Sequence, residues 1–392
     1  MILGSEVFLK NPKWIQKIKS KKVAYVGHAA SVTQKGELVL PLLLNHPDLL
    51  ISSVFSPQHG FGGVQQANMI TSEDTRWKEL PLFSLYSQKT RRLTKAMKDS
   101  FDVLLFDLQD VGCRIYTYLT TLFYLIEDCE NEKTIYILDR PNPLGRYVEG
   151  NCLDLNFKSF VGEAALPMSH GLTLGEAALW FKHHRNLKTD LQVIPMRSYS
   201  PKHPLKNKVW VDPSPNMTSL SCAKCYPGTV LLEGTTLSEG RGTTKPLEVF
   251  GHPNMNVKKI KSFIKEYGKA WFKGCFLREK EFEPQFDKFK NKTCYGFQIH
   301  LDSSWSSKGE FRPYRLMNLL LKAFRHTHPE IPWKLNPPYE YEFKKWPIDI
   351  ISGDETLKNW IESSQTSFKE REEYLLHEEQ KWKKQRKDFL IY

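Results

Sequence analysis

The chain has 392 residues, of which 40% are hydrophobic and 12% aromatic, and its formal net charge is +12 at pH 7. This length suits two domains, and the composition excludes an intrinsically disordered chain. The positive charge favours anionic partners, but the lysines are scattered and not interleaved with aromatic residues, so we expect no nucleic-acid partner. The seven cysteines have no framework spacing, which indicates a reducing compartment.

The first 20 residues contain no continuous apolar segment of a secretion signal, because residues 10–13 (KNPK) interrupt it. No apolar run reaches the roughly 18 residues that a membrane helix needs. We therefore expect a cytoplasmic protein with no membrane span. The sequence makes no prediction of the oligomeric state.

Short apolar runs alternate with helix-like segments through the first half of the chain. Strands are predicted at residues 22–27, 50–56, 82–86, 101–108, 134–138 and 191–196. Helices are predicted at residues 37–45, 91–98, 118–129 and 174–183. This alternation predicts an α/β fold with a mostly parallel sheet that helices cover on both faces.

The second half is less regular. Residues 213–253 are rich in Gly, Thr, Ser and Pro, and we expect a long functional loop there. Beyond this loop, residues 257–267 and 313–325 are predicted to be helices, and residues 293–301 a strand. Residues 366–388 are predicted to form a helix whose mixed charges face solvent.

Four turns, at residues 56–60, 107–114, 138–145 and 167–171, place polar side chains directly after apolar runs. Successive strand ends of a parallel sheet lie on one edge, so these turns are expected to converge on a single crevice. The side chains expected there include Gln58, His59, Asp110, Arg114, Asn142 and His170. For Asn142 the alternative is a rigid turn held by local hydrogen bonds.

A fifth polar stretch, LEGTTLSEGRGTT at residues 232–244, combines Glu233, Glu239 and Arg241 with glycines. Glycine permits close backbone approach to a ligand, and Arg can grip a carboxylate or phosphate with two hydrogen bonds. The stretch matches neither a phosphate loop nor a dinucleotide-binding turn. The alternative is an ion-paired loop in which Arg241 bridges one of the glutamates.

Two further motifs argue against a cofactor. Cys222 and Cys225 form one C-x-x-C pair with no two further ligands nearby, so we expect no metal. The first predicted strand runs into VGHAASVTQKG and not into a GxGxxG turn. This argues against a nucleotide-binding oxidoreductase, and we expect no cofactor.

Taken in order, several of these segments resemble the successive motifs of one family. They are SPQHGFGG, DLQDVGCRIYTY, LDRPNPLG, SHGLTLGE, PSPNM, YPGTVLLEGTTLSEGRGTT and the closing FLIY. The pattern is similar to that of the NamZ-type exo-β-N-acetylmuramidases, from about residue 23 to residue 392. The resemblance implies a Rossmann-like, doubly wound domain over residues 1–245, a smaller α/β domain over residues 246–392 and a cleft between them.

The resemblance also implies hydrolysis of terminal β-1,4-linked N-acetylmuramic acid from the non-reducing ends of peptidoglycan fragments, in cell-wall turnover. The candidate catalytic residues are Glu239, Glu233, Asp110 and Gln58. The candidate substrate-binding residues are His59, Arg114, Tyr116, Asn142, His170, Asn216 and Arg241. Arg114 or Arg241 is expected to clamp the lactyl carboxylate of muramic acid.

The sequence departs from the family pattern at Gln58, where the family has the glutamate of Ser-Pro-Glu-His-Gly, and at Arg146, where it prefers glycine. An amide cannot transfer a proton, and glycoside hydrolysis ordinarily uses two carboxyl groups. Either another carboxylate is the acid, or the 2-acetamido group of the substrate acts as nucleophile. The alternative function is a catalytically impaired, muropeptide-binding protein. We expect the enzyme, because the other polar turns are retained.

Overall fold

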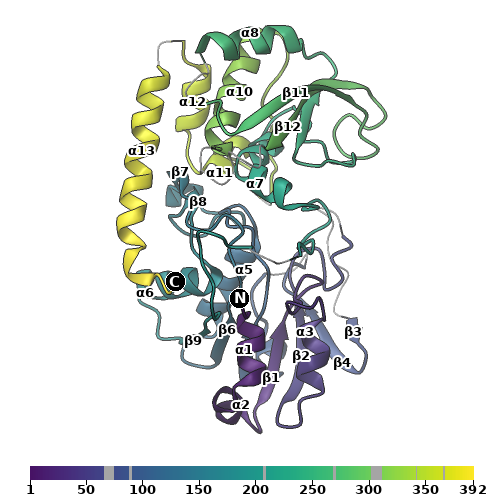
Figure 1. The fold of residues 1–392 in the computed structure, drawn as a ribbon, viewed down its shortest axis with the longest axis vertical. Helices are drawn as coiled ribbons and strands as arrows, with labels where there is room; N and C mark the ends of the chain where they lie inside the picture. Colours follow the sequence, from purple (N-terminus) through teal and green to yellow (C-terminus); the bar gives the residue numbers. More distant parts are fainter. Residues whose placement is uncertain are drawn as a thin grey trace.

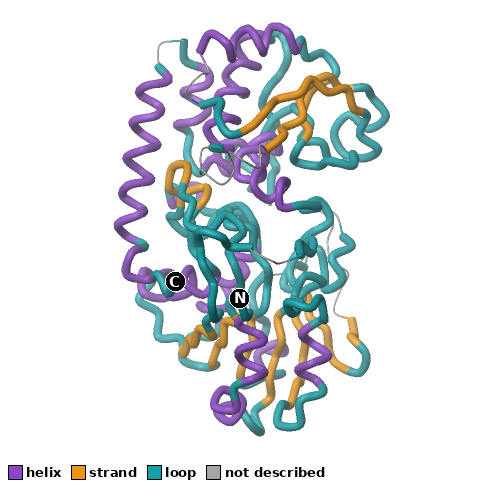
Figure 2. Tube along the Cα trace, viewed as in Figure 1, coloured by secondary structure: helices purple, strands orange, loops and turns teal. Residues whose placement is uncertain are grey.

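The computed structural model describes residues 1–65, 75–87, 91–205, 209–267, 271–301, 311–340, 342–364 and 367–392. It confirms the α/β class: a large sheet and a small sheet lie at opposite ends of the elongated molecule (Figure 1). Between them most of the chain is loop, drawn teal in Figure 2.

The large sheet has seven strands in the order β3-β4-β2-β1-β5-β6-β9. They are β1 (Lys22–Val26), β2 (Leu50–Ser56), β3 (Thr75–Trp77), β4 (Leu80–Ser84), β5 (Val103–Phe106), β6 (Thr134–Leu138) and β9 (Asp190–Ile194). Only the edge strand β3 pairs antiparallel among these. Counted along the chain, the six parallel strands lie in the order 3-2-1-4-5-6, which is the Rossmann order.

Helices cover both faces of this sheet. Successive side chains of a strand point to opposite sides, so buried apolar strands present apolar surface on each face. In β1, Ala24 and Val26 join one hydrophobic cluster, whereas Val23 and Tyr25 join another. The second cluster is covered by α1 (Gly4–Lys10), α2 (Pro12–Ile18) and α3 (Val39–Leu44). The first is covered by α4 (Lys95–Asp99), α5 (Tyr118–Asp128) and α6 (Leu174–His184). This doubly wound arrangement is the predicted one, and the predicted strands and helices of the first half each coincide with one of these elements.

The smaller sheet is antiparallel, in the order β10-β12-β11, and its strands are β10 (Val249–His252), β11 (Cys275–Phe282) and β12 (Cys294–Leu301). The helices of this part are α7 (Leu220–Thr229), α8 (Val257–Tyr267), α10 (Pro313–Thr327), α11 (Pro347–Ser352) and α12 (Thr356–Glu362). A short hairpin, β7 (Glu149–Cys152) and β8 (Pro167–Ser169), lies between the two sheets. The proposed boundary at residue 245 falls between η2 (Val230–Gly234) and β10 and stays a prediction.

The expectation of a loop over residues 213–253 is wrong, because this stretch contains α7, η2 and β10. Its small residues serve helix packing: a Cβ added at Gly228 would lie 2.0 Å from the carbonyl oxygen of Pro313, at the start of α10. The thiols of Cys222 and Cys225 are buried on α7. Composition alone cannot separate a polar loop from a helix whose small residues permit close contact.

The last helix, α13 (Phe368–Gln385), is not simply a solvated helix. It runs along one side of the molecule from beside α12 toward α6, and is yellow in Figure 1. Arg371, Leu375, Glu379 and Trp382 form a buried face at helical spacing. The remaining positions carry the mixed charges that suggested a solvated helix.

Candidate active site

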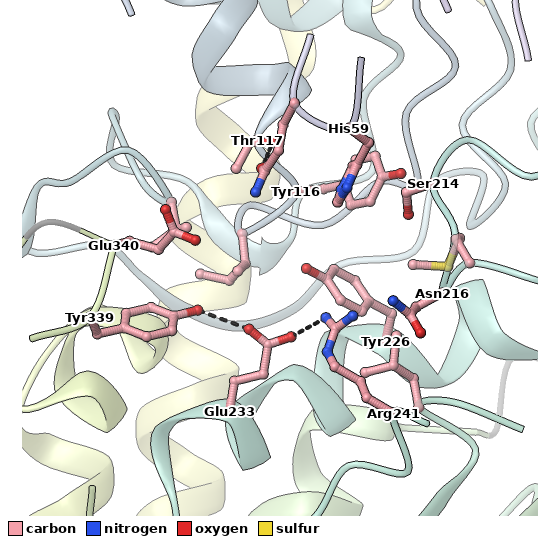
Figure 3. Close-up of a pocket in the computed structure, with 15 residues that line it drawn as sticks. His59, Tyr116, Thr117, Ser214, Asn216, Tyr226, Glu233, Arg241, Tyr339 and Glu340 are labelled. Carbon is pink, nitrogen blue, oxygen red and sulfur yellow. Dashed lines mark hydrogen bonds and ion pairs between the residues drawn. The ribbon is translucent and has the colours of Figure 1, made fainter. Parts of the chain in front are cut away.

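A cavity lies beyond the carboxyl edge of the large sheet, where the turn after β2 meets the segment around η2 and residues 339–340 (Figure 3). Its wall includes Gln58, His59, Asn216, Glu233, Arg241 and Glu340. Tyr116 lines it as well. The structure therefore brings together six residues singled out from the sequence, Gln58, His59, Tyr116, Asn216, Glu233 and Arg241, and adds Glu340.

Gln58 is held firmly on this wall. Its side chain is buried, and the hydroxyl of Thr117, just before α5, donates a hydrogen bond to Oε1 at 2.7 Å. A hydroxyl can donate equally well to a carboxylate, so the surroundings suit either an amide or a carboxylate at position 58. With the amide present, the side chain at position 58 can form hydrogen bonds but cannot exchange protons.

His59 presents a neutral imidazole. Its Nδ1 lies 2.6 Å from the carbonyl oxygen of Gln65, so Nδ1 carries the proton and Nε2 is an acceptor. Burial lowers its pKa to about 4, although the bond to Gln65 opposes this shift, and the charge of Arg241 lowers it further. At neutral pH His59 is therefore a hydrogen-bonding group and not a cation.

Arg241 bridges both glutamates of its glycine-rich stretch, which is the ion-paired alternative considered above. Its Nη2 donates to Glu233 at 2.6 Å, and its Nε lies 3.3 Å from Glu239. Glu233 also accepts from the hydroxyl of Tyr339 at 3.0 Å, and Figure 3 shows both contacts. Ion pairing does not exclude ligand binding by Arg241, so its predicted role toward a lactyl carboxylate stays a prediction.

Glu239 is placed differently from Glu233. It is buried, is not on the cavity wall and lies 3.1 Å from Nζ of Lys288. Burial alone would raise its pKa, but the charges of Lys288 and Arg241 outweigh burial and lower it. An ionised carboxylate sealed between two cations does not suit the role of a general acid at neutral pH.

Glu340 is the residue that the sequence did not reveal. Its carboxylate lines the same cavity as Glu233, and the hydroxyl of Tyr86 donates to Oε2 at 3.2 Å. Burial, and then the charge of Glu233, raise the pKa of Glu340 to about 7. It belongs to the segment NPPYEYEF, which has no periodic or catalytic pattern that could have marked it.

The other predicted turns converge behind the cavity wall and not on it. Asp110 and His170 are buried, with Oδ2 and Nε2 3.9 Å apart. Burial raises the pKa of Asp110 to about 7, and burial with nearby arginines lowers that of His170 to about 3. Asn142 donates to the carbonyl of Leu172 and accepts from the amide of Leu144, as the rigid-turn alternative requires. The expectation that all these side chains line one cleft is therefore corrected.

The expected contact between Arg114 and a lactyl carboxylate is wrong. Its side chain is buried, and its Nη1 and Nη2 donate to four backbone carbonyls at 2.7–3.0 Å. The acceptors are the carbonyls of Asn151, Leu166, Ile351 and Ser352. This guanidinium joins the β7–β8 hairpin to the end of α11 and has no access to a ligand in the cavity.

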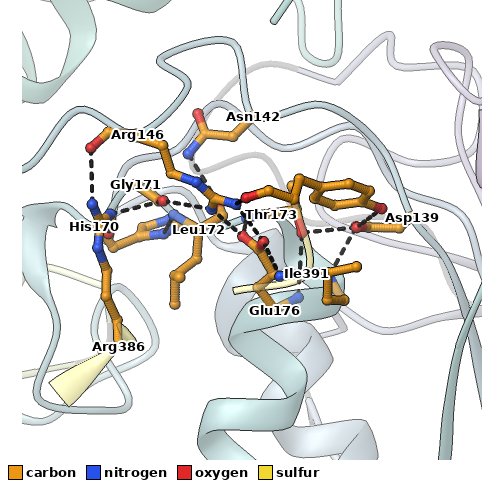
Figure 4. A network of polar contacts seen from close by, with 12 residues as sticks. Asp139, Asn142, Arg146, His170, Gly171, Leu172, Thr173, Glu176, Arg386 and Ile391 are labelled. Carbon is orange, nitrogen blue, oxygen red and sulfur yellow. Dashed lines mark hydrogen bonds and ion pairs between the residues drawn. The ribbon is translucent and has the colours of Figure 1, made fainter. Parts of the chain in front are cut away.

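Arg146, the second departure from the family pattern, has a structural role (Figure 4). It forms a paired contact with the carboxylate of Glu176, with Nη2 to Oε1 at 2.6 Å. Its Nη2 also donates to the carbonyl of Tyr392 at 2.9 Å, and the amide of Ile391 donates to Glu176 at 2.8 Å. Arg146 and Glu176 thus anchor the C-terminal segment.

Within the described ranges, no helix combines the length and the apolar character needed to cross a bilayer. The same part of the chain contains no group of three or more His, Cys, Asp or Glu side chains arranged to hold a metal ion.

Comparison with known proteins gives consistent matches over the whole chain. The family described as exo-β-N-acetylmuramidase NamZ, N-terminal, matches residues 23–221, and its C-terminal counterpart matches residues 224–392. The peptidoglycan β-N-acetylmuramidase NamZ of Bacillus subtilis strain 168 is 31% identical over 387 residues, covering 97% of this chain and 89% of that protein.

Two crystal structures of DUF1343-family proteins from Bacteroides fragilis share the fold. Their TM-scores are 0.85 and 0.74 at 23% and 28% sequence identity. Each alignment covers 100% of this chain and 98% of the other.

Proposed function

Because the chain belongs to the NamZ family of exo-β-N-acetylmuramidases, we propose that it hydrolyses terminal β-1,4-linked N-acetylmuramic acid at the non-reducing ends of peptidoglycan fragments. The seven cysteines are all unpaired, which supports a reducing compartment. We therefore place the reaction in the cytoplasm, in the turnover or recycling of cell-wall fragments.

The observation that carries this proposal is the pair of carboxyl groups on one cavity wall. Glu233 is paired with Arg241, whereas Glu340 has a raised pKa. Glycoside hydrolysis ordinarily uses two carboxyl groups, and here the ion pair with Arg241 suits Glu233 to be the ionised partner, whereas the raised pKa of Glu340 suits it to be the proton donor. Arg241 supplies a guanidinium for the lactyl carboxylate, and His59 and Asn216 supply hydrogen bonds for the sugar.

The second candidate, a muropeptide-binding protein without turnover, is favoured by one observation: position 58 carries an amide in a setting that would also suit a carboxylate. Both functions predict binding of N-acetylmuramic acid, but only the first predicts product.

The test uses purified wild-type protein with chromogenic β-N-acetylmuraminide and β-N-acetylglucosaminide. We expect hydrolysis of the muraminide, at a higher kcat/KM than that of the glucosaminide, because only the muraminide carries a lactyl carboxylate. Calorimetry measures binding of N-acetylmuramic acid in parallel. Binding without any hydrolysis would overturn the hydrolase and support the binding protein.

A further inference from the structure

Glu340 borders two spaces. On one side it lines, with Glu233, the cavity of about 50 Å³, and on the other it lines a groove of about 450 Å³. The other walls of this groove include Arg91, Arg92, Tyr124, Lys158 and Phe160. Its volume lies within the range typical of small-molecule sites. A ligand that occupied both spaces would therefore pass the carboxylate of Glu340.

The groove combines aromatic rings with cations. The guanidinium of Arg91 lies over the rings of Tyr86 and Phe160, 4.9 and 5.1 Å from their centroids, and that of Arg92 lies 4.5 Å from the centroid of Tyr124. Rings offer apolar contact to the faces of a saccharide. Arg92 is ion-paired with Glu127 and Asp128, and Lys158 with Glu163, so these side chains offer hydrogen-bond donors to hydroxyl groups and not an unpaired charge. These are the features expected where the leaving part of the substrate lies.

We propose that Glu340 is a catalytic residue: N-acetylmuramic acid binds at the cavity, which admits part of the sugar, the leaving saccharide lies in the groove, and Glu340 protonates the glycosidic oxygen between them. This inference rests on the proposed function and names the acid of that reaction.

The surroundings of Glu340 support this role. Tyr86 donates to Oε2 and fixes the carboxyl group, which leaves Oε1 to carry the proton. Burial has the largest influence on the pKa of Glu340, and the charge of Glu233 also favours the protonated form; the hydrogen bond from Tyr86 and the charges of Arg91 and Arg241 oppose it. The other two glutamates near the cavity differ from Glu340 because each is ion-paired: Glu233 with Arg241, and Glu239 with Lys288.

In the proposed step the bond between the anomeric carbon and the glycosidic oxygen breaks, and its electron pair stays with the oxygen. That oxygen takes the proton of Glu340, so the saccharide leaves as an alcohol. Water supplies the hydroxyl group that the anomeric carbon gains, and the proton released from water replaces the one that Glu340 gave. The protein ends the cycle unchanged.

The test replaces Glu340 by its isosteric amide, Glu340→Gln. The substitution is made both in the wild-type protein and in the Gln58→Glu variant. Each protein is assayed with two substrates that contain the same muramic acid. One carries 4-nitrophenol, which leaves without protonation, and the other carries N-acetylglucosamine, which does not. We expect turnover of the disaccharide to fall about 10²- to 10⁴-fold and that of the nitrophenyl glycoside less than tenfold. Glu330→Gln, at an exposed carboxylate away from both spaces, is the control and should change neither rate.

The pH profile is the second readout. Because Glu340 must carry its proton, turnover of the disaccharide should decline as pH rises through about 7, the value to which the pKa of Glu340 is raised. Glu340→Gln should lack this decline, and a melting curve should show it folded. Equal loss on both substrates, or unchanged turnover, would overturn the assignment. If no protein cleaves either substrate, the proposed function itself fails.

Discussion

At the scale of single residues, the position of cations decides what each carboxyl group of the site can do. Glu239 lies between Lys288 and Arg241 and is ionised, whereas Glu340 has no ion pair among its described contacts and its pKa is raised to about 7. The same residue type therefore serves as a structural anion in one place and is suited to donate a proton in another.

Gln58 gives the first prediction. Gln58→Glu should raise turnover of the chromogenic muraminide about 10²- to 10⁴-fold, because it adds to Glu233 and Glu340 a third carboxyl group, at the position where the family pattern has its glutamate, and Thr117 can still donate to it. Steady-state kinetics measures the change, with Gln58→Asn as a control that adds no carboxyl group. Robust wild-type hydrolysis that Gln58→Glu leaves unchanged would discard the idea of an impaired site.

Arg241 gives the second prediction. Arg241→Lys keeps the charge but loses the planar fork, so binding of N-acetylmuramic acid should weaken by about 1–3 kcal/mol. Because Arg241 also bridges Glu233 and Glu239, calorimetry should include N-acetylglucosamine as the matched ligand. Loss of affinity for both sugars alike would show a structural effect and rule the lactyl clamp out.

At the scale of elements, the C-terminal segment holds together the residues that follow β6 and β9 and the first turn of α6. The hydroxyl of Tyr392 donates to Asp139 at 2.8 Å and accepts from the amide of Met196 at 2.8 Å, while the amide of Ile391 reaches Glu176. Figure 4 shows Ile391 beside Glu176 and Asp139. Ile391 and Tyr392 thus stabilise the carboxyl edge of the large sheet.

Tyr392→Phe should therefore lower the free energy of unfolding by about 1–3 kcal/mol, since it leaves a buried amide and a carboxylate oxygen each short of one partner. Denaturant titration measures this change. Tyr295→Phe is the matched control, because that tyrosine is 40% exposed, and it should have no measurable effect. Equal stability of the two variants would contradict the structural role of the C-terminal hydroxyl.

At the scale of the whole molecule, a buried ion network joins distant segments. Arg315 lies on α10, and its Nη1 is 3.4 Å from Oε1 of Glu149 in β7. Two carboxylates of α13 also contact it: Oε2 of Glu372 is 2.7 Å from its Nε, and Oε1 of Glu379 is 2.6 Å from its Nη1. The side chain of Arg315 is 1% exposed. The β7–β8 hairpin, which Arg114 also binds, is thereby connected to α10 and α13.

Arg315→Met should cost about 3–5 kcal/mol of unfolding free energy, because it leaves Glu149 and Glu379 buried without their cation. Urea unfolding, followed by both fluorescence and circular dichroism, measures the loss. Lys369→Met removes a cation from the exposed pair with Glu373 and should leave stability unchanged. A small cost for Arg315→Met would mean that the network contributes little to holding the parts together.

The sequence by itself determined the α/β class, the parallel strands and their helices, and the turns that lie at the carboxyl edge, because periodicity and turn chemistry are local signals. Its ordered motifs also pointed to the correct family. It missed α7 and the buried face of α13, where small or charged residues conceal helix packing.

Only the tertiary structure decided which polar side chains line the cavity. Arg114 was expected at a ligand, but its acceptors on α11 lie 237 and 238 residues away. Glu340 was not expected there, and its partner Tyr86 lies 254 residues away. The role of a polar side chain depends on burial and on the charges around it, and partners so distant along the chain leave no local pattern in the sequence.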